Sequence, residues 1–277
     1  MPELPEVETV CRGLAGALTG KRLTRVLQRR PDMRFPFPEG LSQMMTGQRV
    51  KHVRRRAKYG LIDLSNDQTV IFHLGMSGRM RIEAKQDEEA LGKHDHLYVA
   101  CEDGISVAFN DPRRFGFVDL SATDALSENR FLRDLGPEPL DDAFSSASLS
   151  EALAGKATPI KSALLDQRVV AGLGNIYVCE ALFESGISPK RLARSVPGRR
   201  AERLVPAIKS VLARAIKRGG STLRDYVHVD GQLGYFQHDF QVYGREGELC
   251  KTPGCGHLVK RIVQSGRSTF FCSHCQR

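Results

Sequence analysis

Residues 59–74 read YGLIDLSNDQTVIFHL, two apolar runs on either side of the polar turn SNDQ. The arrangement recurs at residues 97–109, where LYVAC and ISVAF flank EDG. Short alternating runs split by turn residues are typical of β-hairpins. No crossover helix separates the paired runs, so the strands are predicted to be antiparallel. Residues 22–120 are therefore expected to form an antiparallel β-sandwich or barrel.

A leading helix is predicted before this β-rich region. Apolar residues recur at helical spacing from Val7 to Leu18. Pro5 suits the first turn of a helix and Gly20 suits the position after its end, which places the helix at about residues 5–18.

The second half of the chain has a different pattern. Residues 134–151 are acidic, contain proline and are rich in serine, which indicates a linker. Four segments between residues 148 and 219 have helical patterns, and one helix is expected to start at about Asn175. The predicted fold class is α+β with several domains: a β-sandwich domain with a leading helix (1–135), a linker (136–150), a helical domain (151–235) and a cysteine-bearing ribbon (239–277).

The charge of the chain favours a polyanionic partner. The net charge is +9 and the isoelectric point is about 9.3. Residues 21–58 hold twelve Lys and Arg against two acids, and residues 187–218 hold ten against one. Such clusters favour nucleic acid over a merely solvated basic face, with a membrane or an acidic protein as alternatives. No apolar run is long enough to span a bilayer and no signal peptide is evident, so a cytoplasmic location is expected.

Four of the seven cysteines lie in the last 28 residues, and their spacing predicts a metal site. Two close pairs separated by a loop can supply four thiolates to one structural Zn²⁺, a better interpretation than disulfides in a reducing compartment. These residues are Cys250, Cys255, Cys272 and Cys275. The loop between the pairs predicts a hairpin that turns at Ser265-Gly266. Arg267 follows the turn, where it could clamp a phosphate or lie solvated on the surface.

Three further motifs have both a functional and a structural interpretation. AGLGNIY sets glycine-rich backbone before a helix, which suits phosphate, although Asn175 could simply cap that helix. HLGMSGRM places Met76 on a turn, and NDPRRFGFVDL places Arg113 and Phe115 on another. Such side chains can wedge into a base stack beside an arginine that reads base edges, or they can be ordinary core and surface residues.

The first ten residues, MPELPEVETV, combine proline with acids. Pro2 permits removal of Met1, which would leave a secondary amine. An α-amino group titrates near pH 8, so it suits a Schiff-base nucleophile. Glu3 and Glu6 flank that amine and could donate a proton or orient water. An acidic helix start that complements the helix dipole is the alternative interpretation.

Taken together, these motifs resemble those of the bacterial formamidopyrimidine-DNA glycosylases. The matching stretches run in order along nearly the whole chain: PELPEVET (2–9), AKYG (57–60), HLGMSG (73–78), KHDH (93–96), DPRRFG (111–116), GPEPL (136–140), GLGNIY (172–177), GGSTLRDY (219–226) and the four-cysteine tail. Leu4 within PELPE favours this family over endonuclease VIII, whose opening has glycine there. The first cysteine pair encloses four residues, where members of the family often have two.

The resemblance implies a β-sandwich with a leading helix, a helix–two-turn–helix domain and a zinc ribbon. It implies a monomer that binds damaged double-stranded DNA and needs no obligate protein partner. The enzyme would flip out an oxidised purine, chiefly 8-oxoguanine or formamidopyrimidine, cut the glycosidic bond and then cut the backbone by β,δ-elimination.

Roles of single residues are also implied by the resemblance. Pro2 would be the nucleophile, Glu3 the acid that helps open the sugar ring and Glu6 the support of the amine and its water. Lys58 would assist β-elimination and Arg267 δ-elimination. The remaining implied contacts are DNA-binding residues (His94, Lys156, Asn175), residues that fill the gap left by the flipped base (Met76, Arg113, Phe115) and a loop that closes over that base (Ser221, Thr222).

The sequence is also compatible with two competing hypotheses. A non-catalytic DNA-binding protein would keep the basic clusters, wedge residues and zinc but would have no need of Pro2, Glu3 and Glu6. A pyrimidine-preferring relative would differ only in the base that it excises.

Overall fold

The computed structural model describes residues 1–221 and 234–277. They form two units. The N-terminal unit comprises Met1–Arg133 and Arg218–Tyr235, and the C-terminal unit comprises Asp134–Lys217 and Phe236–Arg277. The segment that begins at Arg218 thus returns to the first unit, although it directly follows a helix of the second.

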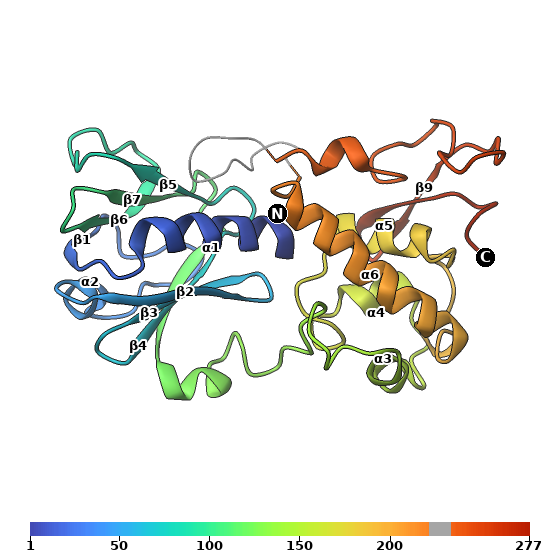
Figure 1. The fold of residues 1–277 in the computed structure, drawn as a ribbon, viewed down its shortest axis with the longest axis horizontal. Helices are drawn as coiled ribbons and strands as arrows, with labels where there is room; N and C mark the ends of the chain where they lie inside the picture. Colours follow the sequence, from blue (N-terminus) through green and yellow to red (C-terminus); the bar gives the residue numbers. More distant parts are fainter. Residues whose placement is uncertain (222–233) are drawn as a thin grey trace. The chain divides into compact units, whose positions relative to one another are not determined.

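Two four-stranded sheets build the N-terminal unit (Figure 1). Their orders are β1-β6-β7-β5 and β2-β3-β4-β8, and all neighbouring strands are antiparallel. The predicted sandwich is therefore confirmed. The strands are β1 (Leu23–Gln28), β2 (Val50–Arg56), β3 (Tyr59–Leu64), β4 (Gln68–His73), β5 (Arg79–Glu83), β6 (Asp95–Cys101), β7 (Ser106–Asn110) and β8 (Phe117–Ala122).

The predicted hairpin at residues 59–74 pairs β3 with β4, and Ile62 lies opposite Val70. Both strands are buried over nearly their whole length, which explains why they read as apolar runs. Gly60 allows β4 to pack closely, because a Cβ at this position would lie 2.0 Å from the Phe72 ring. The turn closes at Asp67, which has φ +57°.

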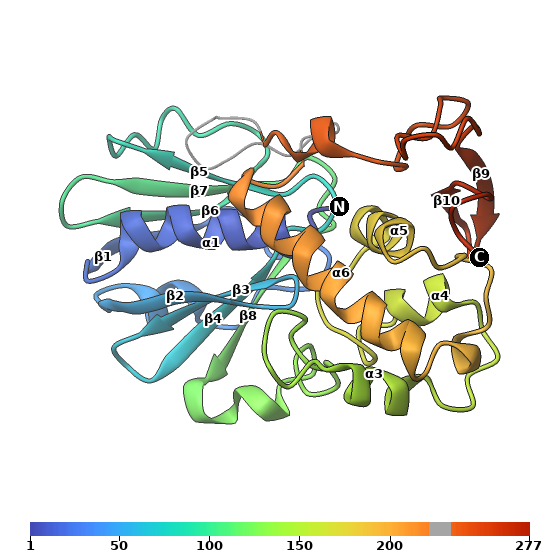
Figure 2. The same ribbon diagram turned by 45° about the vertical axis from the view of Figure 1, so that its right-hand side comes forward.

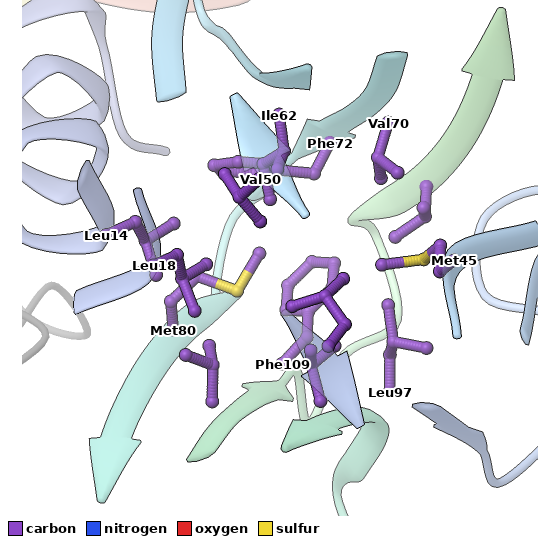
Figure 3. A pocket seen from close by; sticks show the side chains of 14 residues that line it. Leu14, Leu18, Met45, Val50, Ile62, Val70, Phe72, Met80, Leu97 and Phe109 are labelled. Carbon is purple, nitrogen blue, oxygen red and sulfur yellow. The ribbon is translucent and has the colours of Figure 1, made fainter. Parts of the chain in front are cut away.

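Helix α1 (Leu4–Leu18) lies along the opening between the two sheets (Figures 1 and 2). Its apolar face contacts β2, β3 and β5. Inside the sandwich, side chains from α1 and both sheets surround a cavity of about 30 Å³ (Figure 3). Its lining is apolar and includes Leu14, Phe72 and Phe109. The unit also contains α2 (Leu41–Met45) and a 3₁₀ turn, η1 (Thr123–Glu128).

The C-terminal unit contains the helices α3 (Ser146–Leu153), α4 (Ile160–Leu165), α5 (Asn175–Glu184) and α6 (Arg199–Lys217), with 3₁₀ turns η2 (Ala193–Ser195) and η3 (Phe236–Asp239). Helix α6 packs against α3 and α5 (Figure 2). Helix α4 is shorter than its apolar pattern predicts. The Asp166 carboxylate accepts the Arg168 backbone N–H at 3.0 Å, and such a side-chain turn competes with helix continuation.

The ribbon consists of β9 (Lys260–Gln264) and β10 (Arg267–Phe271), paired antiparallel as predicted. Its turn uses Ser265 and Gly266, both with positive φ, which matches the twist of a two-residue hairpin loop. Buried Glu180 on α5 accepts backbone N–H groups of Gln241, Val242 and Tyr243 at 2.8–3.0 Å. This carboxylate fastens the segment that leads into the ribbon onto the helical part of the unit.

Within residues 1–221 and 234–277, no helix is both long and apolar enough to cross a membrane.

Candidate active site, DNA-contact loops and metal centre

The acidic residues of the opening stretch are buried at the start of α1. Glu3 is 4% exposed and Glu6 is 2% exposed, and Pro2 is buried beside them. The Glu3 backbone N–H donates to Glu6 Oε2 at 2.8 Å, which fixes the first turn of the helix. Glu3 and Glu6 also form a capping box at the start of α1, so the helix-start interpretation holds for both. These two lie inside the protein next to the predicted nucleophile.

The second carboxylate oxygen of Glu6 is hydrogen-bonded to Ser221, which lies 215 residues further along the sequence. Glu6 Oε1 accepts the Ser221 backbone N–H at 2.8 Å and the Ser221 hydroxyl at 3.1 Å. Gly220 has φ +80°, and a Cβ there would come within 3.0 Å of the Glu6 side chain. The structure thus joins predicted catalytic and base-recognition residues. Thr222, the other predicted residue of that loop, lies outside the described residues.

Lys58 is 7% exposed and follows the tight turn at Ala57, which has φ +54°. Neighbouring His73 has a pKa lowered to about 4, first because it is buried and then because Lys58, Arg34 and the chain amino terminus are positive. The imidazole is therefore neutral at pH 7. Lys58, on the turn between β2 and β3, thus lies near a neutral imidazole.

The motifs HLGMSG and DPRRFG form two loops that are bonded to each other through Asp111. Its carboxylate accepts the Ser77 hydroxyl at 2.5 Å and the Gly116 backbone N–H at 2.7 Å. Ser77 in turn accepts the Arg113 backbone N–H at 3.2 Å. Gly75 is required at this contact, since a Cβ would lie 2.3 Å from the backbone of the other loop.

These bonds leave the predicted gap-filling side chains exposed. Met76 is 39% and Phe115 is 45% exposed, and the Arg113 guanidinium stacks over the Phe115 ring at 4.7 Å. A core interpretation of Met76 and Phe115 is therefore wrong. His94 is tied to the same place, because its carbonyl accepts the Asp111 backbone N–H at 2.9 Å.

In the C-terminal unit, two predicted DNA-contacting residues lie together. Asn175 is the first residue of α5, and Gly174 rather than Asn175 caps the helix. The Asn175 amide donates to the Ser268 carbonyl at 2.9 Å, directly after exposed Arg267. Lys156 is half-buried at a different place, where its carbonyl accepts the Arg194 backbone N–H at 2.9 Å.

The four C-terminal cysteines converge on one point. Their Sγ atoms lie within 4.8 Å of one another, with Cys255–Cys272 at 3.7 Å and Cys250–Cys275 at 3.9 Å. Zinc–sulfur bonds of about 2.3 Å in a tetrahedron place sulfur atoms about 3.8 Å apart, so the thiols fit one Zn²⁺ with no open position for water. This set of ligands makes the centre structural, as predicted.

The longer first pair does not prevent this convergence. Its loop closes with the Cys255 backbone N–H on the Thr252 carbonyl at 3.1 Å. His257 and His274 stack on each other at 4.3 Å and are not members of the four-sulfur group.

Sequence reasoning missed two residues that shape these sites, Asp111 and Glu180. The signal for Asp111 was its place at the start of DPRRFG, before two arginines and ahead of a strand. Glu180 gave no such signal, since an acid inside a helical pattern is ordinary. Only tertiary structure shows that its carboxylate meets three backbone N–H groups.

Comparisons with known proteins cover both units. The family descriptions "Formamidopyrimidine-DNA glycosylase N-terminal domain", "Formamidopyrimidine-DNA glycosylase H2TH domain" and "Zinc finger found in FPG and IleRS" match residues 1–118, 135–227 and 247–277. The formamidopyrimidine-DNA glycosylases of Ruegeria pomeroyi and Cereibacter sphaeroides are 54% and 55% identical to the chain, with 100% of each sequence covered.

Solved structures give the same assignment. The MutM (Fpg) protein of Thermus thermophilus matches with a TM-score of 0.88 and 41% identity over 99% of this chain and 98% of that one. Lactococcus lactis Fpg matches with 100% of both chains covered: its complex with abasic-site DNA at a TM-score of 0.89 and 34% identity, and its complex with DNA containing N7-benzyl-Fapy-dG at 0.90 and 35%. By sequence along its whole length and by fold, the chain belongs to the formamidopyrimidine-DNA glycosylase family.

Proposed function

We propose that this protein excises oxidised purines, 8-oxoguanine and formamidopyrimidines, from duplex DNA and then nicks the strand as an AP lyase. The observation that carries the proposal is the buried Glu3–Glu6 pair beside Pro2 in a chain of this family. DNA binding alone requires no buried carboxyl groups at an amino terminus. The proposal includes a monomeric enzyme in the cytoplasm, acting without an obligate protein partner.

The first step would be attack of the Pro2 nitrogen on C1′ of the damaged nucleotide. The new N–C1′ bond replaces the glycosidic bond, whose electron pair leaves with the base. The departing base takes up the proton that the Pro2 nitrogen loses, Glu3 would protonate the sugar ring oxygen as the ring opens, and the product is an iminium ion on Pro2. This chemistry requires loss of Met1, because Pro2 is otherwise an amide. Glu6 would support the amine and its water while its contacts to Ser221 hold the recognition loop.

Two eliminations would follow. Lys58 would assist removal of a C2′ proton, and the C3′–O bond breaks with its electron pair on the 3′ phosphate. Arg267 would assist the second elimination, in which the C4′ proton is lost and the C5′–O bond breaks with its electron pair on the 5′ phosphate. The iminium ion accepts electron density in both steps, and hydrolysis then releases Pro2. Lys58 and Arg267 are cationic, so both would also hold phosphates.

The remaining site residues would bind and distort the duplex. Met76 and Phe115 are exposed on bonded loops and would fill the gap left by the flipped base, with Arg113 reading the opposite cytosine. His94, Lys156 and Asn175 would contact the DNA, and the loop with Ser221 and Thr222 would close over the base.

The test is borohydride trapping on a duplex that contains 8-oxoguanine. We expect a covalent protein–DNA adduct with protein shown by mass spectrometry to lack Met1. Pro2→Gly and Glu3→Gln should lower turnover by about 10²–10⁴-fold. Glu8→Gln is the matched control, because Glu8 lies on the same helix but pairs with Arg55 at 2.9 Å. Absence of an adduct with native protein lacking Met1 would exclude the proposal. Faster cleavage of thymine glycol than of 8-oxoguanine would instead assign a pyrimidine-preferring enzyme.

A further inference from the structure

Lys161 is a lysine whose side chain is completely buried. It lies on α4 with 0% exposure, and its Nζ donates to Thr269 Oγ1 at 2.7 Å and to the Ser268 carbonyl at 2.9 Å. Thr269 is also 0% exposed. Lysines are rarely buried in full, because removing an ammonium from water is costly. An amino group buried here that donates to two groups of one strand holds that strand in place by hydrogen bonds.

The strand that Lys161 holds is β10, which begins at Arg267. The Ser268 carbonyl accepts from Lys161 and, at 2.9 Å, from the Asn175 amide. The carbonyl of Ser268, the residue that follows Arg267, is thus hydrogen-bonded to both α4 and α5.

The Arg267 side chain itself has no such restraint. It is exposed, and within the described parts of the chain no hydrogen bond or ion pair to it is found. Its backbone pairs with Gln264 across the hairpin turn. The hydrogen bonds at Ser268 and the pairing with Gln264 therefore place the backbone from which the guanidinium extends.

We propose that Lys161 is a positioning residue for Arg267. The inference rests on the proposed role of Arg267 in δ-elimination, and it deepens that role. Lys161 is fully buried, and its amino group fixes the Ser268 carbonyl and with it the strand that carries Arg267. A displacement of about 1 Å of a catalytic group costs about 100-fold in rate, so loosening these hydrogen bonds is expected to slow the step that depends on Arg267.

The experiment separates the two eliminations on an 8-oxoguanine duplex. Lys161→Met keeps the length of the side chain and removes charge and donors. We expect borohydride trapping at Pro2 to change less than about threefold, while conversion of the β-product to the β,δ-product falls about 10- to 100-fold. Arg267→Ala is the benchmark for a full loss of this step. Ser162→Ala is the matched control, because Ser162 contacts the same hairpin at Ser265, 3.0 Å away, through an exposed hydroxyl pair.

A double variant tests whether Lys161 acts through Arg267. In the Arg267→Ala background, Lys161→Met should cause no further loss in the ratio of products. Independent losses in the double variant, or a Lys161→Met ratio equal to that of Ser162→Ala, would overturn the inference. If Arg267→Ala itself leaves the ratio unchanged, the proposed role of Arg267 fails instead.

Zinc content and thermal unfolding show whether each variant keeps its ribbon. If Lys161→Met loses zinc, the pair Thr269→Val and Thr269→Ser decides. Thr269→Val removes one acceptor of the ammonium and should lower the product ratio, whereas Thr269→Ser keeps the hydroxyl and should restore it. Equal ratios for these two variants would also overturn the inference.

Discussion

His73 shows how one buried side chain can serve a reactive site. Its Nδ1 accepts the Gly75 backbone N–H at 3.0 Å, so the neutral ring carries its proton on Nε2. The ring stacks on Phe117 with centroids 5.4 Å apart. This hydrogen bond shapes the turn that presents Met76, and it requires that Nδ1 stay unprotonated. Burial and the neighbouring positive charges keep it so.

The titration of His73 predicts an acid-sensitive fold. The pKa is lowered from 6.5 to about 4 in the folded protein, so between these values the unfolded chain binds more protons. Stability must therefore fall as pH drops from about 6.5 to about 4, by up to about 3 kcal/mol from this group. His73→Gln should show a shallower fall. Urea unfolding at pH 7, 5.5 and 4.5 measures the difference, and equal slopes for both proteins would contradict the assignment.

At the scale of elements, helix α1 and hairpin β3–β4 contain glycines that differ in how closely other atoms pack against them. Gly16 lies inside α1, is exposed, and would have nothing within 4 Å of an added Cβ. Gly60 lies in β3 against the Phe72 ring. The sequence letters are the same, but only Gly60 makes a close contact.

Two alanine substitutions test this contrast. Gly16→Ala is expected to raise the free energy of unfolding by about 0.5–1 kcal/mol, because alanine loses less backbone entropy in a helix. Gly60→Ala is expected to lower it by several times that amount, since the Cβ would lie 2.0 Å from Phe72. Thermal or urea denaturation of both variants beside the parent protein measures the two signs. A destabilised Gly16→Ala would show that the helix interior is under another constraint.

At the scale of the whole molecule, the metal centre connects stability with the proposed chemistry. The ribbon is small, and Gln276 joins it to the rest of its unit by donating to the Ile187 carbonyl at 3.0 Å. A domain of this size depends on its metal for folding, since structural zinc binding supplies about 10–16 kcal/mol. Arg267 is the first residue of β10, so its position in the ribbon depends on zinc.

Removal of zinc is expected to affect the ribbon and the functions that depend on it, but not the folding of the β-sandwich. After chelation, or in Cys272→Ser, the metal content should fall and the ribbon should unfold at lower temperature, with loss of the Arg267-dependent elimination and weaker DNA binding. The β-sandwich contains none of the four ligands, so its own unfolding transition should remain. Metal analysis, calorimetry and gel assays give the three readouts. Full δ-elimination by zinc-free protein would refute the dependence.

Much of this architecture was predictable from local patterns. The hairpin at residues 59–74, the helix from about residue 5 and the four-cysteine centre follow from alternation, helical spacing and ligand spacing, which are local properties of the chain. The end of α4 was not predictable from apolar periodicity, because the Asp166 carboxylate competes with the helix for a backbone N–H. Strong apolar periodicity indicates which residues are buried. It does not indicate where a side chain competes with the helix for a backbone N–H group.

Sequence by itself determined the types of elements, the zinc ligands and the residues that could carry amine chemistry, because these depend on composition and spacing within short segments. Tertiary structure decided which of them meet. Glu6 and Ser221 are 215 positions apart, and the Lys161–Thr269 bond spans 108. Such pairs depend on how buried polar groups find partners across the fold, since each must be satisfied inside the protein, and no local pattern records the partner.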